Sequence, residues 1–228
     1  MANIIKKAVA GLLEKMLKPA TVLAVREWDP APVYEVEISY SGVLMENWTS
    51  VKRLKCKVGL LEFRDYTPAC WEAEKGICTL FIEAGHQGAG SRWVRELKAG
   101  DEVLLDEAHG AHVPPGPGQV LGLGDGSAIG HFLALKKLLP EGSSLDAALF
   151  LNAAHSPDLL FSGKYPSFNF VSGTDRFEEL RNWCAGRDLS VYSFIYLAGN
   201  IPMIKRLRTM LKQMVGPDVK IYAHGFWS

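Results

Sequence analysis

The spacing of apolar residues predicts one helix and then a series of short strands in the first half of the chain. Apolar residues recur at helical intervals over 4–17, with lysines between them, and Pro19 ends this amphipathic pattern. From Thr21 onward, apolar residues alternate with polar ones, as they do in half-buried strands. The strands predicted in this way cover 21–28, 33–38, 51–58, 60–63, 77–82 and 103–105. Short, regularly spaced strands with few helices predict a small antiparallel β-barrel.

In the second half, apolar strands alternate with helical patterns. Buried strands are predicted over 119–123, 147–152 and 191–198, and helices over 128–139, 176–183 and 203–214. The block 156–171 is rich in Pro, Ser, Gly and aromatic residues, and we interpret it as a loop followed by a short strand. Strands that alternate with helices form β-α-β units, so this half predicts an α/β domain with a mostly parallel sheet.

The two halves meet at a stretch that favours neither a helix nor a sheet. The sequence from Gly110 to Gly118 contains three prolines and three glycines. We therefore predict two domains, a β-barrel with an N-terminal helix over 1–113 and a parallel α/β domain over 119–228, joined by a linker at 114–118.

Composition and charge narrow the class of protein. The chain has 228 residues, 48% of them apolar, and its 25 basic and 25 acidic residues cancel. This balance argues against a protein that binds nucleic acid. The N-terminal stretch lacks the features of a signal peptide, and no apolar run is long enough to span a bilayer. We expect a cytoplasmic protein without membrane association, and a monomer, although no sequence feature reports on oligomeric state.

Cysteines and histidines show no metal-binding pattern. The four cysteines at 56, 70, 78 and 184 are scattered, so they predict neither a disulfide framework nor a zinc site. His109 and His112 lie in the glycine- and proline-rich stretch without further ligands. We predict no metal site.

Two short segments carry groups suited to a phosphate-bearing aromatic ligand. Arg64 can donate paired hydrogen bonds to a phosphate, Tyr66 offers a flat face, and the Thr67 hydroxyl can meet a ring nitrogen. The segment 88–91 precedes a helical run at 92–97, so backbone N–H groups and a serine hydroxyl gather at a helix N-terminus.

Each segment has an ordinary alternative. Arg64 could pair with Asp65 beside a core tyrosine, and Ser91 could be a simple helix N-cap. Two phosphate-suited segments at strand ends of one small barrel favour the ligand site over these alternatives.

In combination, the motifs resemble those of the siderophore-interacting proteins, a branch of the ferredoxin-reductase-like flavoproteins. The resemblance covers nearly the whole chain. Each motif alone is common in other proteins, but the combination of motifs is specific to this family. It rests on Arg64-Asp65-Tyr66-Thr67-Pro68, His86-Gln87-Gly88-Ala89-Gly90-Ser91-Arg92-Trp93, Gly100-Asp101-Glu102-Val103, Ala198-Gly199 and Tyr222-Ala223-His224-Gly225-Phe226-Trp227.

The resemblance implies a barrel that binds FAD. It places Arg64 on the phosphate, Tyr66 against the isoalloxazine and Thr67 near the flavin N5. Ser91 and the backbone of 88–90 would hold the pyrophosphate. The flavin residues predicted in this way are Arg64, Tyr66, Thr67, His86, Gly88, Gly90, Ser91 and Trp227.

Two of these implications carry alternatives. The family usually has proline where Ala89 stands, so this loop is expected to be looser and FMN stays open as the flavin. Trp227 either caps the flavin or closes the core of its domain.

The glycine-rich loop of the second half departs from the dinucleotide fingerprint. The spacing Gly-x-Gly-x-x-Gly would require glycine at Ser127. The loop does resemble the turn that ferredoxin-reductase relatives use for a pyridine nucleotide, although a turn that serves only helix–sheet packing is the alternative. The nucleotide residues predicted in this way are Asp125, Gly126, Ser127, Ala128, Ala198 and Gly199.

The resemblance implies that NADPH or NADH reduces FAD, which then reduces a ferric siderophore and releases Fe(II). Arg53, Lys55 and Lys57, here called the basic stripe, are the candidate surface for an acidic chelate, although such a stripe is usually solvated. The alternatives are a reductase for another acceptor, such as a ferredoxin-like protein or free flavin, and a non-catalytic module that binds siderophore or flavin. The choice between NADH and NADPH stays open, because only Lys164 and Arg176 lie near the relevant loop in sequence.

Overall fold

The computed structural model describes residues 17–40, 48–106, 109–110, 116–152 and 159–228. The chain forms two compact units. The barrel unit comprises Met1–Glu27 and Val33–His112, and the sheet unit comprises Trp28–Pro32 and Val113–Ser228. The predicted N-terminal helix up to residue 16, and residues 114 and 115 of the predicted linker, lie outside the described residues.

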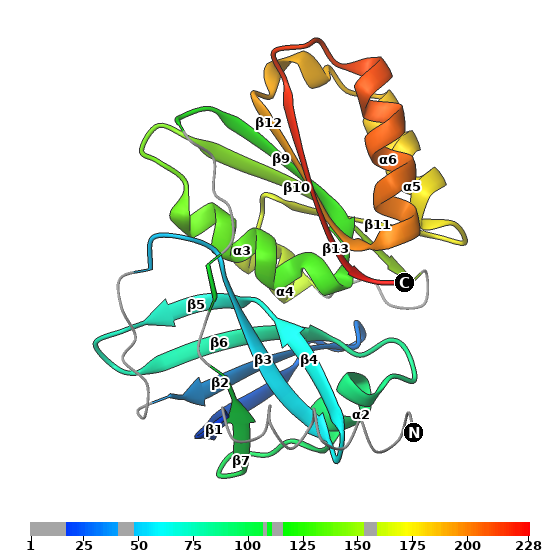
Figure 1. The fold of residues 1–228 in the computed structure, drawn as a ribbon. Helices are drawn as coiled ribbons and strands as arrows, with labels where there is room; N and C mark the ends of the chain where they lie inside the picture. Colours follow the sequence, from blue (N-terminus) through cyan, green and yellow to red (C-terminus); the bar gives the residue numbers. More distant parts are fainter. Residues whose placement is uncertain (1–16, 41–47, 107–108, 111–115, 153–158) are drawn as a thin grey trace, which may run out of the picture. The chain divides into compact units, whose positions relative to one another are not determined.

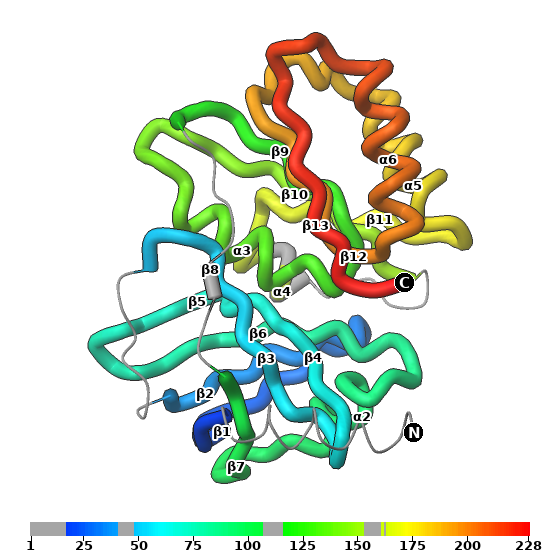
Figure 2. The backbone as a smooth tube through the Cα atoms, in the orientation of Figure 1, coloured from blue at the N-terminus to red at the C-terminus, as the bar shows by residue number. Residues whose placement is uncertain are grey.

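The barrel unit is a nearly closed antiparallel sheet, as the alternating pattern predicted. The sheet order is β4-β3-β7-β1-β2-β6-β5, and β8 pairs with β3 (Figures 1 and 2). One helix, α2 (Ala89–Glu96), lies between β6 and β7 in the chain. The strands are β1 (Lys18–Glu27), β2 (Val33–Ser39), β3 (Lys52–Gly59), β4 (Glu62–Tyr66), β5 (Pro68–Glu72), β6 (Ile77–Glu83), β7 (Glu102–Leu105) and β8 (His109–Gly110).

The interior of the barrel is built from alternate residues of these strands. Ile38, Leu54, Leu80 and Leu105 are completely buried in one cluster. Burying an aliphatic side chain of this size contributes about 1.5–3 kcal/mol to stability, so this cluster is the main source of the barrel's cohesion.

The strands around the candidate flavin residues differ from the prediction. β4 continues to Tyr66, so Arg64 lies within this strand and not after it. β5 follows after a single residue, Thr67, and the sequence did not predict it because it begins with a proline. Proline is tolerated at the first position of a strand, where its missing N–H need not take part in the ladder.

The sheet unit is a five-stranded parallel sheet, as predicted. Its order is β11-β10-β9-β12-β13, and every pair is parallel (Figure 1). The strands are β9 (Gln119–Asp125), β10 (Ser144–Asn152), β11 (Phe168–Gly173), β12 (Phe194–Asn200) and β13 (Lys220–Trp227). The helices are η1 (Gly126–Ala128), α3 (Ile129–Leu138), α4 (Leu159–Lys164), α5 (Arg176–Ala185), η2 (Leu189–Val191) and α6 (Ile201–Met214).

Helices cover both faces of this sheet. Leu121 and Leu123 of β9 share a buried cluster with Leu180 of α5 and Leu207 of α6. On the other face, the Phe132 ring of α3 fills the space beside Gly122. Because all five strands are parallel, their carboxyl ends lie at one edge of the sheet. Open α/β sheets bind ligands at this edge.

Some elements and one segment of the sheet unit were not predicted. α4 lies in the block that was interpreted as a loop, the short helix η2 was not expected, and β13 was noted only as a motif. Trp28–Pro32 also belongs to this unit: Trp28 is buried, and its ring meets the edge of Phe161 at a centroid distance of 5.0 Å.

Candidate functional site

β4 and the start of α2 bring the two predicted flavin segments together. Arg64 and Tyr66 are two residues apart on β4, so their side chains lie on the same side of the strand. The Tyr66 hydroxyl lies so close to Gly90 that a β-carbon at Gly90 would collide with it, and the same atom would lie 3.5 Å from Cγ of Arg64. The close approach of β4 and α2 therefore requires glycine at position 90.

Ser91 is a buried polar side chain at the start of α2. It is 1% exposed, and among the described residues its hydroxyl has no hydrogen-bond partner. The N-cap of α2 is Gly88, so the alternative that Ser91 caps the helix is wrong. Buried hydroxyls normally have a partner, and the first N–H groups of a helix have none within it. Together these groups fit the oxygen atoms of a phosphate.

Tyr66 packs on an aromatic residue that the sequence did not assign to the site. The rings of Tyr66 and Trp93 are stacked, with centroids 6.0 Å apart and planes 13° from parallel. Burial raises the pKa of the Tyr66 phenol, so this hydroxyl stays protonated at neutral pH. Trp93 thus covers one face of the ring that was predicted to meet the isoalloxazine.

Arg64 and His86 are exposed at the edge of this cluster. Arg64 donates from Nη1 to the carbonyl oxygen of Phe63 at 2.7 Å. The Nδ1 atom of His86 lies 3.3 Å from a carboxylate oxygen of Glu83, and its ring would lie 3.0 Å from a β-carbon at Gly88. The cluster therefore presents Arg64 as a permanent cation beside the start of α2, where Arg92 also donates to the carbonyl oxygen of Gln87 at 3.0 Å.

The basic stripe lies on the other side of the β3–β4 ladder from Arg64. Lys55 is opposite Asp65 in this ladder, whereas Cys56 is opposite Arg64, and successive residues point to opposite sides. Asp65 accepts a hydrogen bond from Lys55 Nζ at 2.6 Å and lies 3.7 Å from Arg53 Nε. The alternative pairing of Arg64 with Asp65 is therefore wrong, and Asp65 offsets part of the positive charge of the stripe.

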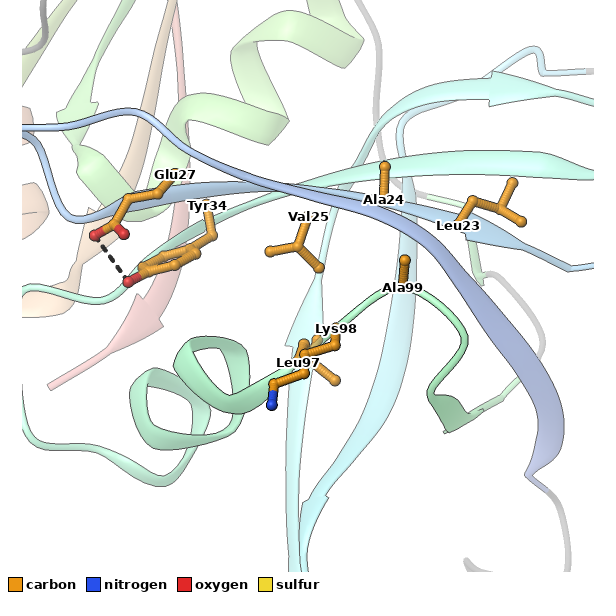
Figure 3. Close-up of a pocket in the computed structure, with 8 residues that line it drawn as sticks. All are labelled: Leu23, Ala24, Val25, Glu27, Tyr34, Leu97, Lys98 and Ala99. Carbon is orange, nitrogen blue, oxygen red and sulfur yellow. Dashed lines mark hydrogen bonds between the residues drawn. The ribbon is translucent and has the colours of Figure 1, made fainter.

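A separate pocket of about 540 Å³ opens on the barrel unit (Figure 3). Aliphatic residues from β1 and from the segment after α2 form most of its wall, and the Tyr34 hydroxyl donates to Glu27 at 2.8 Å. The lining residues are Leu23, Ala24, Val25, Glu27, Tyr34, Leu97, Lys98 and Ala99. None of the predicted flavin residues is among them, so this pocket does not belong to the candidate flavin site.

In the sheet unit, Asp125 ties the ends of two strands together. Its carboxylate accepts hydrogen bonds from the backbone N–H of Asn200 at 2.8 Å, from that of Ser127 at 3.0 Å and from the Ser127 hydroxyl. A β-carbon at Gly199 would lie 2.6 Å from Oδ1 of Asp125, and the φ angle of Gly199 is +121°. Asp125 and Gly199 therefore shape the loop at the carboxyl ends of β9 and β12.

Trp227, at the end of β13, lies at the same edge of the sheet. Its Nε1 donates to the Ser127 hydroxyl at 3.2 Å. The guanidinium carbon of Arg176 lies 5.0 Å from a ring centroid of Trp227 and 5.6 Å from that of Phe150. The structure thus groups Trp227 with the predicted nucleotide residues, whereas the sequence motif grouped it with the flavin. It adds Arg176 and Phe150, whose contacts only the tertiary fold reveals.

The remaining predicted nucleotide residues are buried. Gly126 and Ala128 lie in η1, and Ala198 is completely buried in β12. A β-carbon at Gly124 would collide with the carbonyl oxygen of Ala198, and one at Gly122 would lie 2.9 Å from the Phe132 ring. The side chains at 128 and 198 therefore serve packing, and any ligand contact there would come from the backbone.

Two features are absent from the described part of the chain, a metal-binding cluster and a membrane-spanning helix. No group of three or more His, Cys, Asp or Glu side chains is arranged to hold a metal ion there. No helix in those ranges is both long enough and apolar enough to cross a bilayer.

Comparison of sequences identifies no relative. No protein-family model matches the chain, and no curated protein matches it.

Comparison of folds gives many matches. A siderophore utilization protein from T. fusca is 18% identical with a TM-score of 0.70, and the match covers 92% of each chain. The siderophore-interacting protein SipS from Aeromonas hydrophila is 15% identical with a TM-score of 0.69, covering 93% of this chain and 98% of that one. A ferredoxin NADP+ reductase from Neisseria gonorrhoeae, solved with bound FAD and NADP, is 18% identical with a TM-score of 0.65, covering 91% and 98%. The fold expected from the sequence motifs is confirmed.

Proposed function

We propose that the chain is a flavin-dependent NAD(P)H oxidoreductase that reduces a ferric siderophore and releases Fe(II). The observation that carries the proposal is the anion cradle of the barrel unit. There, the unpartnered hydroxyl of Ser91 and the first N–H groups of α2 lie next to β4, which carries Arg64 and Tyr66.

These residues have the chemistry that FAD requires. Arg64 carries the charge and the planar donors for a phosphate, and Ser91 and α2 supply neutral donors to the same group. Tyr66, held against Trp93, offers an ordered aromatic surface. Thr67, between β4 and β5, remains the candidate for the flavin N5.

The sheet unit provides the candidate site for the electron donor. Asp125 holds the ends of β9 and β12 in a fixed loop, and open α/β sheets bind nucleotides at such an edge. The Neisseria gonorrhoeae reductase with this fold was solved with NADP as well as FAD, which supports the assignment.

Bound FAD would supply the step from hydride transfer to single-electron transfer. One NAD(P)H gives up a hydride, which is two electrons and a proton, so it reduces two ferric ions and leaves NAD(P)+ and H+. The siderophore as acceptor is supported by the structural matches to the siderophore utilization protein from T. fusca and the siderophore-interacting protein SipS from Aeromonas hydrophila. The basic stripe is the candidate surface for an acidic chelate, although Asp65 offsets part of its positive charge by pairing with Arg53 and Lys55.

An absorbance experiment tests this function. We expect the purified protein to take up FAD and to lose the flavin absorbance when NADPH or NADH is added without oxygen. The absorbance should return when a ferric siderophore follows, with Fe(II) captured by a colorimetric chelator. Ferredoxin and free flavin serve as rival acceptors, and faster turnover with either would replace the siderophore in this proposal. A protein that takes up no flavin would refute the proposal as a whole.

Ser91→Ala links the test to the cradle. The hydroxyl has no partner among the described residues, so its loss should leave the stability of the flavin-free protein unchanged and weaken FAD binding about 10-fold. Ser39→Ala, at a half-buried serine of β2, is the matched control and should change neither quantity. Equal FAD affinity in all three proteins would show that Ser91 does not hold the cofactor.

A further inference from the structure

The turn between β3 and β4 carries the most exposed large apolar side chain among the described residues. Leu60 is 84% exposed, whereas the next in order, Val191, is 51% exposed. Leu60 and the half-buried Leu61 form the turn itself, between Gly59 at the end of β3 and Glu62 at the start of β4. In Figure 1 this turn lies at the lower end of the barrel unit. The fold of the hairpin therefore holds a leucine in water.

Two leucines are unusual residues for such a turn. Hairpin turns favour Gly, Asn, Asp and other polar residues, for reasons of backbone conformation and of solvation. Packing within the chain does not explain Leu60, because so little of its side chain is covered. Positions at which a sequence breaks local rules without a structural gain are often functional. The side chain of Leu60 is therefore a candidate contact for an apolar surface outside the chain.

The hairpin behind this turn is basic, although the chain as a whole is neutral. Residues 52–66 contain five basic and two acidic residues, a net charge of +3, whereas the 25 basic and 25 acidic residues of the whole chain cancel. Asp106 accepts a hydrogen bond from the backbone N–H of Lys55 at 2.6 Å, and it reduces this excess by one charge. The basic stripe occupies alternate positions of β3, so its three side chains point to one side of the hairpin.

An apolar tip with cations behind it has the chemistry of a peripheral membrane contact. A bilayer surface combines an apolar layer that accepts a leucine with anionic headgroups that attract lysine and arginine. A turn that exposes its leucine can enter a fluid surface without a matching shape on the other side. A protein partner is the rival, and it would have to present an apolar pocket that fits this turn.

We propose that the β3–β4 turn attaches the protein reversibly to an anionic membrane surface, with Leu60 in the apolar layer and the basic stripe facing the headgroups. One leucine and a small excess of positive charge each contribute little, so binding needs both and salt weakens it. This inference does not rest on the proposed function. It departs from the sequence-based expectation of no membrane association, which considered signal peptides and spanning segments only.

Co-sedimentation of the full-length protein with lipid vesicles tests the proposal. We expect binding at low ionic strength to vesicles of equal parts phosphatidylcholine and phosphatidylglycerol, and much weaker binding to phosphatidylcholine alone. Leu60→Ser should lower the partition coefficient for the mixed vesicles about 10-fold. Lys57→Gln should lower it about 5-fold. Leu23→Ser is the matched control, because Leu23 is an exposed leucine of β1 in the same unit, and it should bind like the unmodified protein.

Three results would overturn the inference: no binding to the mixed vesicles, equal binding of Leu60→Ser and the unmodified protein, or equal binding to both kinds of vesicle. The first is the result expected if the turn docks on a protein instead. Circular dichroism separates a loss of binding from a loss of fold, and Leu60→Ser should keep the native spectrum because the side chain is exposed.

The anionic headgroup and the acidic chelate of the proposed function place the same demand on the basic stripe, so Leu60 is the residue that distinguishes them. Leu60→Ser should take up FAD as the unmodified protein does, because it changes none of the candidate flavin residues. A protein that binds the mixed vesicles but no flavin would keep this inference and lose the proposed function. A flavin reductase that ignores the vesicles would keep the function and lose this inference.

Discussion

Gly90 determines how closely α2 can approach β4, and its role can be isolated with one pair of substitutions. A β-carbon at this position would collide with the Tyr66 hydroxyl but would lie 3.5 Å from Cζ of the same ring, an ordinary contact. Gly90→Ala should therefore lower the free energy of unfolding of the flavin-free protein by about 1–3 kcal/mol through overpacking. In a Tyr66→Phe background, where the hydroxyl is gone, the same substitution should cost much less.

The double-mutant cycle is read from urea unfolding of the four proteins. A cost of Gly90→Ala that is the same in both backgrounds would contradict the contact between Tyr66 and residue 90. In that case the glycine would be needed for its backbone conformation and not for the approach of the tyrosine.

Single residues divide into those that the sequence identifies and those that need the fold. Arg64 and Ser91 could be chosen from sequence, because their chemistry suits a phosphate and each stands in a recognisable motif. Trp93 could not, since its stacking on Tyr66 depends on how α2 packs on β4. Arg176 was one of two candidate cations by sequence distance, and only its contacts with Trp227 and Phe150 separate it from Lys164.

Among the elements, the junction of β9, η1 and β12 depends on one buried carboxylate. Asp125 is 4% exposed and accepts hydrogen bonds from Ser127 and Asn200. Asp125→Asn replaces one acceptor oxygen with an NH2 group that faces an N–H or O–H donor. We expect it to lower the stability of this junction by about 1–3 kcal/mol.

Hydrogen exchange of the Asn200 amide measures this loss locally, since its N–H is bonded to Asp125 in the native protein. Asp188→Asn is the matched control, because Asp188 accepts from the N–H and the hydroxyl of Ser190 in the same local pattern but is exposed. Its effect should be much smaller. Equal effects of the two substitutions would show that burial adds nothing to the role of Asp125.

The elements that the sequence predicted are those with a clear period, and the ones it missed break the period for a physical reason. β5 begins with Pro68, a residue that argues against a strand unless it occupies the first position. α4 is only six residues long, too short for a helical period to appear. α2 starts three residues before the prediction, because Ala89, Gly90 and Ser91 form its first turn although two of them are poor helix formers.

For the whole molecule, the change from alternating to helical periodicity was enough to predict two units of different class. The barrel and the parallel sheet are both confirmed. The assignment of Trp28–Pro32 to the sheet unit could not be foreseen, since it depends on the burial of Trp28 beside Phe161 in a distant part of the chain. Periodicity reports which side of an element is buried, and it does not report what buries it.

A buried histidine in the sheet unit predicts how the stability of the molecule responds to acid. The sheet unit contains His131 on α3, which is 2% exposed, and its Nε2 has no hydrogen-bond partner in the described ranges. Burial, and secondarily the neighbouring His224, lowers the pKa of His131 from 6.5 to about 3. The fold therefore holds His131 neutral, whereas the unfolded chain takes up a proton below pH 6.5. The stability contributed by the neutral form is complete above pH 6.5 and is lost as the pH falls toward 3, by up to about 1.4 kcal/mol per pH unit.

His131→Leu removes this proton uptake and keeps an apolar side chain of similar size. Its free energy of unfolding should fall less than that of the unmodified protein between pH 7 and pH 5, as measured by urea unfolding at both values. His86→Leu is the control, because the His86 side chain is 54% exposed. Parallel pH profiles of the unmodified protein and His131→Leu would show that His131 is protonated in the folded state. That result would imply water or a rearrangement around α3, because a charged imidazole cannot remain desolvated without a partner. If the profiles diverge as expected, His131 gives the sheet unit a loss of stability in acid that an apolar side chain at the same position would not cause.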